Sequence, residues 1–383
     1  MTFKPLNEND VVNTRTLLHE AIPLTGSIVS GSYLNTSVSP AEPTNVKSYS
    51  HGMFQTVYDY PYLSSSANHV FDMTFGISSQ ASASLTFGTS GMPTKKRNLY
   101  GQMSQILMGY DATGSVQRFD EDGDLYDISN ANKIEHAFIL PFSRLLVKDE
   151  IKKETFEMKL GVDATWASPQ TWSNIITISD LGASTEYRVN SPAGEYGILY
   201  ATASAGTTLL NTAALTHIYT DTLGNNYWRC GLIFYQAGIA VLTGSLFSDE
   251  ATKPGHGLLA AAAEMNSSTN FIDTMITDSS IDDMNEAFRH RLQNIQFNNT
   301  TELNSTVYFC RANHNEFNYS SNPTYLENSR IRVKTQATDD PVSYITTVGL
   351  YNDRNELLAT AKLSEALKKT PSQEFTIRAR LDY

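Results

Sequence analysis

Residues 375–383 read Phe-Thr-Ile-Arg-Ala-Arg-Leu-Asp-Tyr and carry the clearest strand pattern of the chain. Apolar side chains occupy every second position, as expected of a strand with one buried face. The same alternation recurs in residues 71–77, Phe-Asp-Met-Thr-Phe-Gly-Ile, and in residues 155–160, Thr-Phe-Glu-Met-Lys-Leu. These segments predict a fold built mainly from antiparallel β-sheets.

Helical patterns are fewer. One face of an amphipathic helix is predicted by the spacing of Leu99, Met103, Ile106, Leu107 and Tyr110. Residues 258–265 contain strong helix formers. Ser280 and Asp283 resemble a capping box, and the helix they would start turns Ile281, Met284, Phe288 and Leu292 toward a core. The predicted class is α+β, predominantly β, with antiparallel sheets or sandwiches, a few short helices and an inserted β-rich domain.

The pattern of strands and turns divides the chain into three parts. Residues 1–47 are turn-rich and polar toward their end, so we interpret them as an N-terminal arm. Residues 162–250 contain short strands with turn signals about every ten residues, which predicts an inserted β-rich domain. Residues 48–161 and 251–383 would then form one discontinuous main domain. Within it, Asn352–Asn355 is a polar loop between two strands, as in a hairpin.

Composition and charge exclude some classes of function. The net charge is −12, the pI is about 5.1, and charged residues make up 18% of the chain. A general nucleic-acid binder needs a basic face for phosphates, so we expect no nucleic-acid partner. No apolar stretch is long enough to span a bilayer, and no signal pattern follows Met1, so we expect no membrane partner.

Cysteine usage points to a reduced compartment. The two cysteines, Cys230 and Cys310, are interpreted as buried free thiols, and the spacing leaves open whether they pair. Cys310 and His314 stand at CxxxH spacing, but no second Cys/His pair completes a zinc site.

Searches for catalytic motifs give no enzyme signature. The sequence has no HExxH, no GxSxG nucleophile elbow, no GxxxxGK[ST] loop and no GxGxxG before a helix. A cell-wall or polysaccharide hydrolase would need a cleft with two carboxylates at a fixed separation. We therefore predict that the chain is not an enzyme.

One acidic loop has the composition of a metal site. Asp120, Asp122 and Asp124 stand at the alternate spacing of a calcium loop. Counting from Asp120, however, Gly123 is at position four and Ala131 at position twelve, where the calcium motif needs Gly at six and Glu at twelve. We interpret the loop as a solvated hairpin tip, with a Ca²⁺ or Mg²⁺ site as the alternative, and we expect no other cofactor.

The predicted inserted domain offers a second alternative. Trp166 and Trp172 bracket a short turn segment, and Trp228 lies further along. Buried tryptophans would belong to a core, whereas exposed ones would stack on sugar rings. An exposed aromatic groove would make residues 162–250 a host-glycan-binding module.

The C-terminal strands carry a resemblance to a known group. The strand Tyr344–Asp353 (Tyr-Ile-Thr-Thr-Val-Gly-Leu-Tyr-Asn-Asp), the polar turn and Glu356–Leu363 (Glu-Leu-Leu-Ala-Thr-Ala-Lys-Leu) resemble virion structural proteins of large contractile-tailed phages. The segments at residues 60–76, 142–146 and 317–325 are also similar to that group. The likeness covers the outer two-thirds of the chain and is weakest over residues 162–250.

This resemblance implies a structural subunit of the virion tail, synthesised in the host cytoplasm. A wedge-type baseplate component that bridges neighbouring tail proteins is the leading hypothesis, and a neck, collar or capsid-associated protein is the alternative. Its partners would be other tail proteins and further copies of the chain in a symmetric ring. The expected assembly contacts lie at the hairpin tip and the last strand, at Tyr351, Asn352, Asp353 and Tyr383.

Overall fold

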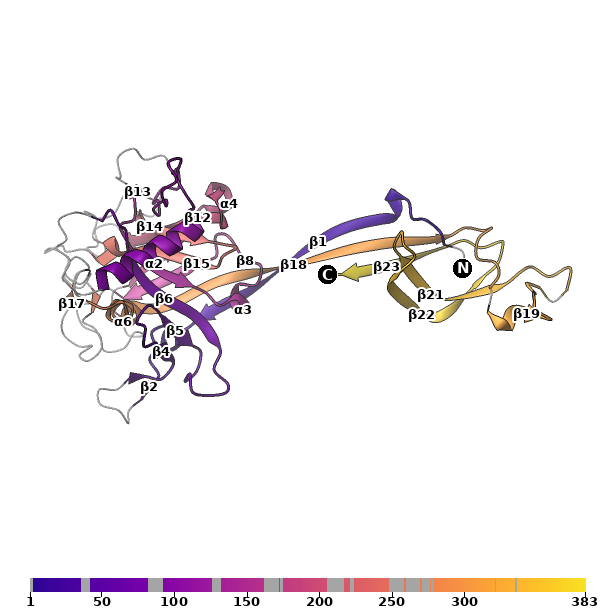
Figure 1. Ribbon diagram of the computed structural model, residues 1–383, viewed down its shortest axis with the longest axis horizontal. Coiled ribbons are helices and arrows are strands. Elements are labelled where there is room, and N and C mark those ends of the chain that lie inside the picture. Colours follow the sequence, from indigo (N-terminus) through magenta and orange to yellow (C-terminus); the bar gives the residue numbers. More distant parts are fainter. Residues whose placement is uncertain are drawn as a thin grey trace. The chain divides into compact units, whose positions relative to one another are not determined.

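The computed structural model describes residues 3–35, 42–81, 92–125, 132–161, 172, 175–204, 217–220, 224–247, 258–259, 269–270, 276, 279–320, 322–334 and 336–383. The chain divides into two compact units. Unit 1 comprises Met1–Leu18 and Glu302–Tyr383, and unit 2 comprises His19–Thr301. The predicted class is confirmed, because the chain is mostly antiparallel β-sheet with a few short helices (Figure 1).

Unit 2 is built around one large sheet. Its strands follow in the spatial order β18 (Leu292–Ala312, first half), β9 (Glu157–Gly161), β10 (Ile175–Ser179), β12 (Gly194–Ser204), β14 (Asn225–Phe234), β15 (Ile239–Thr243), β7 (His136–Pro141), β6 (His69–Ile77), β5 (Gln55–Tyr58) and β4 (Val46–Ser48). Short strands are β8 (Glu150–Ile151), β11 (Arg188–Ser191), β13 (His217–Thr220), the pair β2 (Leu34–Asn35) and β3 (Glu42–Pro43), and the pair β16 (Leu258–Leu259) and β17 (Thr269–Asn270).

The helices of unit 2 are mostly short. They are α1 (Gly26–Val29), α2 (Met92–Leu107), α3 (Arg144–Val147), α4 (Ala183–Glu186), the 3-10 turn η3 (Gly244–Phe247) and α6 (Ile281–Arg291). The predicted capping box of α6 is confirmed: Ser280 Oγ accepts from the Asp283 N–H at 3.0 Å, and Asp283 Oδ2 accepts from the Ser280 N–H at 2.9 Å. Of the predicted apolar face, Ile281, Met284 and Phe288 lie on α6 and are buried, and Leu292 is also buried but begins β18. No helix among the described residues is both long and apolar enough to cross a bilayer.

Two helical expectations need correction. Leu258 and Leu259 form strand β16 rather than a helix, and residues 260–265 lie outside the described residues. The predicted face of α2 is buried at Leu99 and Leu107, but Ile106 is exposed and Tyr110 lies beyond the helix end. The sheet therefore covers a narrower face of α2 than the apolar spacing suggested.

The central strands of unit 2 are apolar on both faces because both faces are covered. In β7, Phe138 and Leu140 join the cluster that contains the α6 side chains, while Ala137 and Ile139 join the cluster that contains those of α2. A Cβ at Gly76 of β6 would lie 2.9 Å from the Tyr100 backbone nitrogen, so glycine lets α2 pack directly on the strand.

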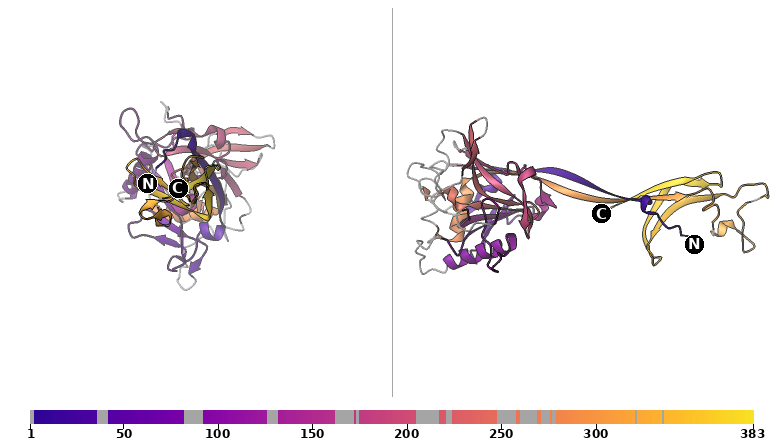
Figure 2. Two further views of the ribbon diagram at one scale, coloured as in Figure 1. Left: turned by 90° about the vertical axis from the view of Figure 1, so that its right-hand side faces the viewer. Right: turned by 90° about the horizontal axis from the view of Figure 1, so that it is seen from above.

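Unit 1 has a different construction. Strand β1 (Val11–Leu24, through Leu18 in this unit), the second half of β18 and β23 (Phe375–Asp382) form a three-stranded sheet with β18 in the middle. In Figure 1 and in the right-hand view of Figure 2, β1 (indigo) and β18 (orange) run side by side, as their pairing requires. The long strands β21 (Ser343–Tyr351) and β22 (Leu357–Lys369) form a two-stranded ribbon, and the remaining elements are β19 (Leu326–Glu327), β20 (Arg330–Ile331) and the 3-10 turns η1 (Glu8–Asp10) and η4 (Pro323–Tyr325).

These units differ from the predicted division of the chain. The segment 162–250 supplies β10, β12, β14 and β15, which lie between β9 and β7 of the same sheet and form no separate insertion. The predicted arm is split, because its residues up to Leu18 belong to unit 1 and its later ones to unit 2. Strand pairing between residues far apart in the sequence determines where the two units begin and end. Local periodicity carries no information on such pairing.

The phenylalanine cluster of unit 2 gives a direct stability test. Phe138 is fully buried, and its ring centroid lies 4.5 Å from that of Phe288 and 4.8 Å from that of Phe75. We expect Phe138→Ala to lower the free energy of unfolding of unit 2 by about 3–5 kcal/mol, because a large cavity replaces the ring. Urea unfolding monitored by circular dichroism measures the change. The control Ile106→Ala, on an exposed side chain, should stay within ~0.5 kcal/mol, and equal effects would contradict the assigned core.

Candidate functional site

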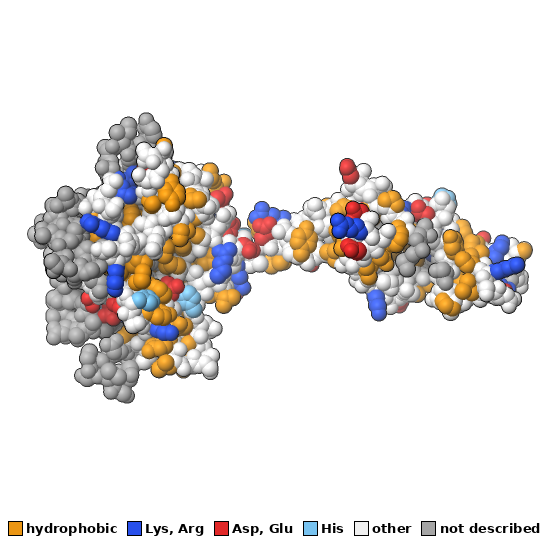
Figure 3. All heavy atoms as spheres, viewed as in Figure 1, with side chains coloured by type: hydrophobic (Ala, Val, Ile, Leu, Met, Phe, Trp, Pro, Cys, Tyr) orange, Lys and Arg blue, Asp and Glu red, His pale blue; other side chains and the backbone are white. Residues whose placement is uncertain are grey.

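Unit 1 buries very few apolar side chains. Among its described residues only Val307, Ala312 and Ala379 are buried hydrophobic residues. Large apolar side chains are instead exposed, and we call this set the exposed apolar set of unit 1. It consists of Phe3, Leu6, Val12, Leu17, Leu18, Leu303, Phe317, Tyr319, Leu326, Ile331, Tyr344, Leu357, Leu358 and Tyr383. Figure 3 shows apolar side chains (orange) on the surface of unit 1, the right-hand part of the view.

The ribbon β21–β22 has no buried face. Along β21 only Ser343 is buried, and along β22 only Lys369 is buried. The pairing is also irregular, because Ile345 pairs with Leu367 whereas Thr347 pairs with Lys362. A two-stranded hairpin is marginally stable in water unless a hydrophobic face is covered. The ribbon is therefore incomplete as a folded element of a single chain.

Polar contacts tie unit 1 together where an apolar core would usually do so. The Lys369 ammonium donates to the Asn318 side-chain oxygen at 2.8 Å and to the carbonyl oxygens of Thr370 at 2.9 Å and His314 at 3.1 Å. Near the N-terminal residues, Lys4 pairs with Glu316 at 2.5 Å. Asp10 accepts from Arg311 at 2.6 Å, and this hydrogen bond is the main reason that the pKa of Asp10 is lowered. Such contacts fix geometry but add little hydrophobic stabilisation.

The predicted assembly residues all lie in unit 1. Tyr351 ends β21, and its ring contacts that of Phe3, with the centroids 4.9 Å apart. Asn352 closes the hairpin loop by accepting from the Glu356 N–H at 2.8 Å, with Asp353 beside it. Tyr383 follows β23, is exposed, and its hydroxyl lies 3.1 Å from that of Thr306. Their role in assembly stays a prediction.

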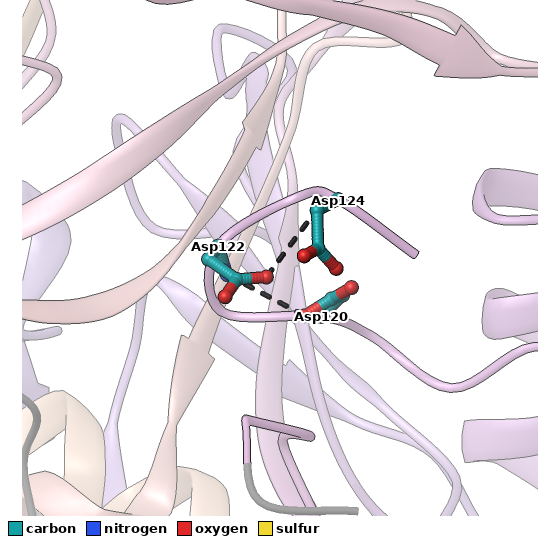
Figure 4. Close-up of side chains that lie close together, drawn as sticks. All are labelled: Asp120, Asp122 and Asp124. Atoms are coloured by element: carbon teal, nitrogen blue, oxygen red, sulfur yellow. Dashed lines mark hydrogen bonds between the residues drawn. The ribbon is translucent and has the colours of Figure 1, made fainter. Parts of the chain in front are cut away.

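The acidic loop lies in unit 2 and is solvated only in part, because Asp120 is buried, Asp122 is partly buried and Asp124 is exposed. Asp120, Asp122 and Asp124 bring their carboxylates together, with ligand atoms within 4.8 Å of one another (Figure 4). Asp120 is 0% exposed, and its carboxylate is bonded at 2.8 Å by the Lys133 ammonium. Arg229 lies 3.6 Å from Asp122. These two cations neutralise charge that a bound metal would otherwise balance.

The backbone of this loop is also anchored to strands β11 and β12. Asn190 donates to the Gly123 carbonyl oxygen at 2.9 Å, and the Tyr196 hydroxyl donates to the same oxygen at 3.3 Å. Sequence spacing could not predict the burial of Asp120 or its contact with Lys133. That contact depends on a segment thirteen residues away. The arrangement holds a loop in place, and nothing beyond the carboxylates themselves favours the Ca²⁺ alternative.

The tryptophans do not form an exposed platform among the described residues. Trp172 is 7% exposed and lies against Gly161, where a Cβ would come within 2.0 Å of its ring. The Arg291 guanidinium lies 5.5 Å from the centroid of the Trp172 ring, so the ring is not open to a sugar. Trp228 is buried, and Trp166 lies outside the described residues. The burial of Trp172 fits the core interpretation and does not support the alternative of sugar stacking.

The cysteines belong to different units. Cys230 lies in unit 2, and burial raises the pKa of its thiol. Cys310 lies in unit 1 on β18 and is partly buried. Both are free thiols, so the pairing that the sequence left open is absent here.

Asp180 is a carboxyl group that the sequence gave no reason to single out. It follows β10, and burial raises its pKa to about 6. Its oxygens accept from the Glu154 N–H at 2.8 Å, the Phe156 N–H at 3.1 Å and the Tyr235 hydroxyl at 3.0 Å. These contacts fix the loop before β9 to the end of β10, which is a structural role.

Comparison with protein-family models, with curated proteins and with solved structures finds no match for this chain.

The raised pKa of Asp180 gives a pH-dependent stability. The folded state holds this proton more tightly than the unfolded state, whose pKa is near 3.8. Protonated Asp180 stabilises the folded state by about 3 kcal/mol below about pH 4. This stabilisation is lost as the pH rises through about 6. We expect this term to disappear in Asp180→Asn, so the difference in unfolding free energy between wild type and variant should change between pH 4 and 7. Urea titrations of unit 2 at each pH measure it, and a constant difference would contradict the assignment.

Proposed function

We propose that this chain is a non-enzymatic structural subunit of a larger assembly, in which neighbouring chains complete unit 1. The assembly we propose is the virion of a tailed phage, with the tail baseplate as the place of the subunit. The strand and turn pattern of residues 344–363, which resembles virion proteins of contractile-tailed phages, supports that choice of assembly. The same pattern fits a neck or collar protein, and the position in the particle separates the two.

The observation that carries the proposal is the contrast between the two units. Unit 2 contains a continuous buried core on both faces of its sheet, whereas unit 1 exposes fourteen large apolar side chains and buries three hydrophobic residues among its described residues. Large apolar side chains that remain exposed where few are buried favour association with other proteins. A surface that is polar and weakly charged elsewhere fits a chain that packs against neighbours.

The chemistry of the described residues also favours a structural role. The carboxylates of Asp120 and Asp180, which burial would make candidates for acid–base work, are bonded by Lys133 and by backbone N–H groups respectively. Both groups hold loops together. The burial of Trp172 likewise removes the main support for a glycan-binding module.

Amide hydrogen exchange tests whether unit 1 needs neighbours. In the dilute full-length chain we expect amides of β21 and β22 to exchange more than about tenfold faster than those of β7 and β14, because local opening costs less where no apolar face is covered. In the assembled particle the β21 and β22 amides should become protected, while those of β7 and β14 stay unchanged. Equal protection of both units in the dilute chain would contradict the proposal.

Imaging tests the assembly itself. We expect electron cryomicroscopy of particles from the virus that encodes this chain to show six- or twelve-fold density for it around the distal tail tube. Mass spectrometry of the same purified particles provides the matched control for its presence. Density at the neck or capsid would place the subunit there instead of in the baseplate. Absence of the chain from the particle would refute the virion proposal.

A further inference from the structure

We infer that the neighbour completing unit 1 is a second copy of this chain, and that it pairs along the free edge of β23. This inference rests on the proposed function and adds the identity of the partner. It is carried by three features of unit 1: the geometry of β23, the second free edge at β1, and the distribution of charge along the chain.

Strand β23 presents a regular, unpaired edge. It pairs with β18 at eight consecutive positions, from Ser305 with Asp382 to Ala312 with Phe375, without a register shift. Asn304 and Tyr383 exchange both backbone hydrogen bonds, at 2.9 and 3.3 Å. Bonded and non-bonded pairs alternate in an antiparallel ladder, so the odd-numbered residues of β23 bond β18 and the even-numbered ones direct their N–H and C=O groups to the opposite edge.

This edge carries charged side chains but lacks the other usual protections against pairing. Natural sheets cover exposed edges with proline, bulges or very short strands, and β23 has none of these over eight residues. The outward-directed backbone groups belong to Thr376, Arg378, Arg380 and Asp382. The Arg380 guanidinium is bonded at 2.6 Å by Asp382, which offsets its charge at this edge. In the part of the chain that the structure describes, β23 pairs only with β18.

The same sheet ends on its other side at a second free edge. Strand β1 pairs only with β18 among the described strands, and its residues Val12 to Leu18 are exposed. A sheet with two free edges can add a strand of an identical chain at either side. Repeating that contact around an axis builds a ring without any new kind of interface when the rotation between copies closes.

The distribution of charge favours unit 1 over unit 2 as the contact surface between identical chains. Unit 1 contains twelve Lys and Arg residues and twelve Asp and Glu residues, so its formal charge is zero. The whole net charge of −12 therefore falls in residues 19–301. Two copies repel each other through unit 2 but not through unit 1, whereas a basic partner of another kind would be drawn to unit 2. A neutral, apolar surface with both signs of charge suits another copy of itself.

The experiment measures the oligomeric state of the full-length chain by sedimentation equilibrium over a range of concentrations. We expect a species larger than the 42.4 kDa monomer. Arg378→Pro removes an outward N–H while leaving the β18 ladder intact, so it should weaken association at least about tenfold. Arg378→Gln removes the same charge but keeps the N–H, and it should associate like the wild type.

A second pair of variants keeps the test decisive if Arg378→Pro fails to fold. Tyr383→Ser, directly after β23 in unit 1, and Leu145→Ser in unit 2 remove large apolar side chains that are 76% and 77% exposed. We expect only Tyr383→Ser to weaken association. A chain that is monomeric at every concentration, or one weakened only by Leu145→Ser, overturns the inference. If particles contain the chain with unit 1 covered by a different protein, the proposed function stands and this inference fails.

Discussion

Strand β18 is the element on which both units depend, because its two halves must satisfy different surroundings. Its first half pairs with β9 and contributes Leu292, Ile295 and Phe297 to the core of unit 2. Its second half pairs with β23 in unit 1, where Ser305 and Thr306 are buried together with Val307. One uninterrupted strand of 21 residues therefore changes from an apolar to a mixed polar interior along its length.

The two units consequently reach stability by different means. In unit 2, helices α2 and α6 cover opposite faces of the sheet, and burial of apolar area supplies the main driving force. In unit 1, ammonium, carboxylate and amide groups such as Lys369 and Asn318 make the connections, and the apolar side chains remain outside. Hydrogen bonds of this kind specify an arrangement more than they stabilise it. Unit 1 is thus well defined in geometry but short of the burial that would hold it.

Local patterns in the sequence identified the elements that depend on local physics. The alternation in residues 375–383 corresponds to β23, the Ser280–Asp283 capping box starts α6, and Asn352 closes the predicted hairpin. Long-range pairing lay beyond these patterns. The place of residues 162–250 in the central sheet depends on distant partners, such as Ile139, which pairs with Val241. The burial of Asp120 likewise depends on Lys133, which no carboxylate spacing could indicate.

The order of synthesis adds a consequence of the way unit 1 is composed. Its strand β1 is synthesised before unit 2, but the unit 1 half of β18 and strand β23 come only after residues 19–301. At ~5–20 residues per second, this delay is roughly 15 to 60 seconds, long enough for domains to fold as units. Unit 2 can therefore mature while β1 waits, and the apolar strands of unit 1 come together last. A chain built in this order completes the sheet of unit 1 only after the core of unit 2 has been synthesised.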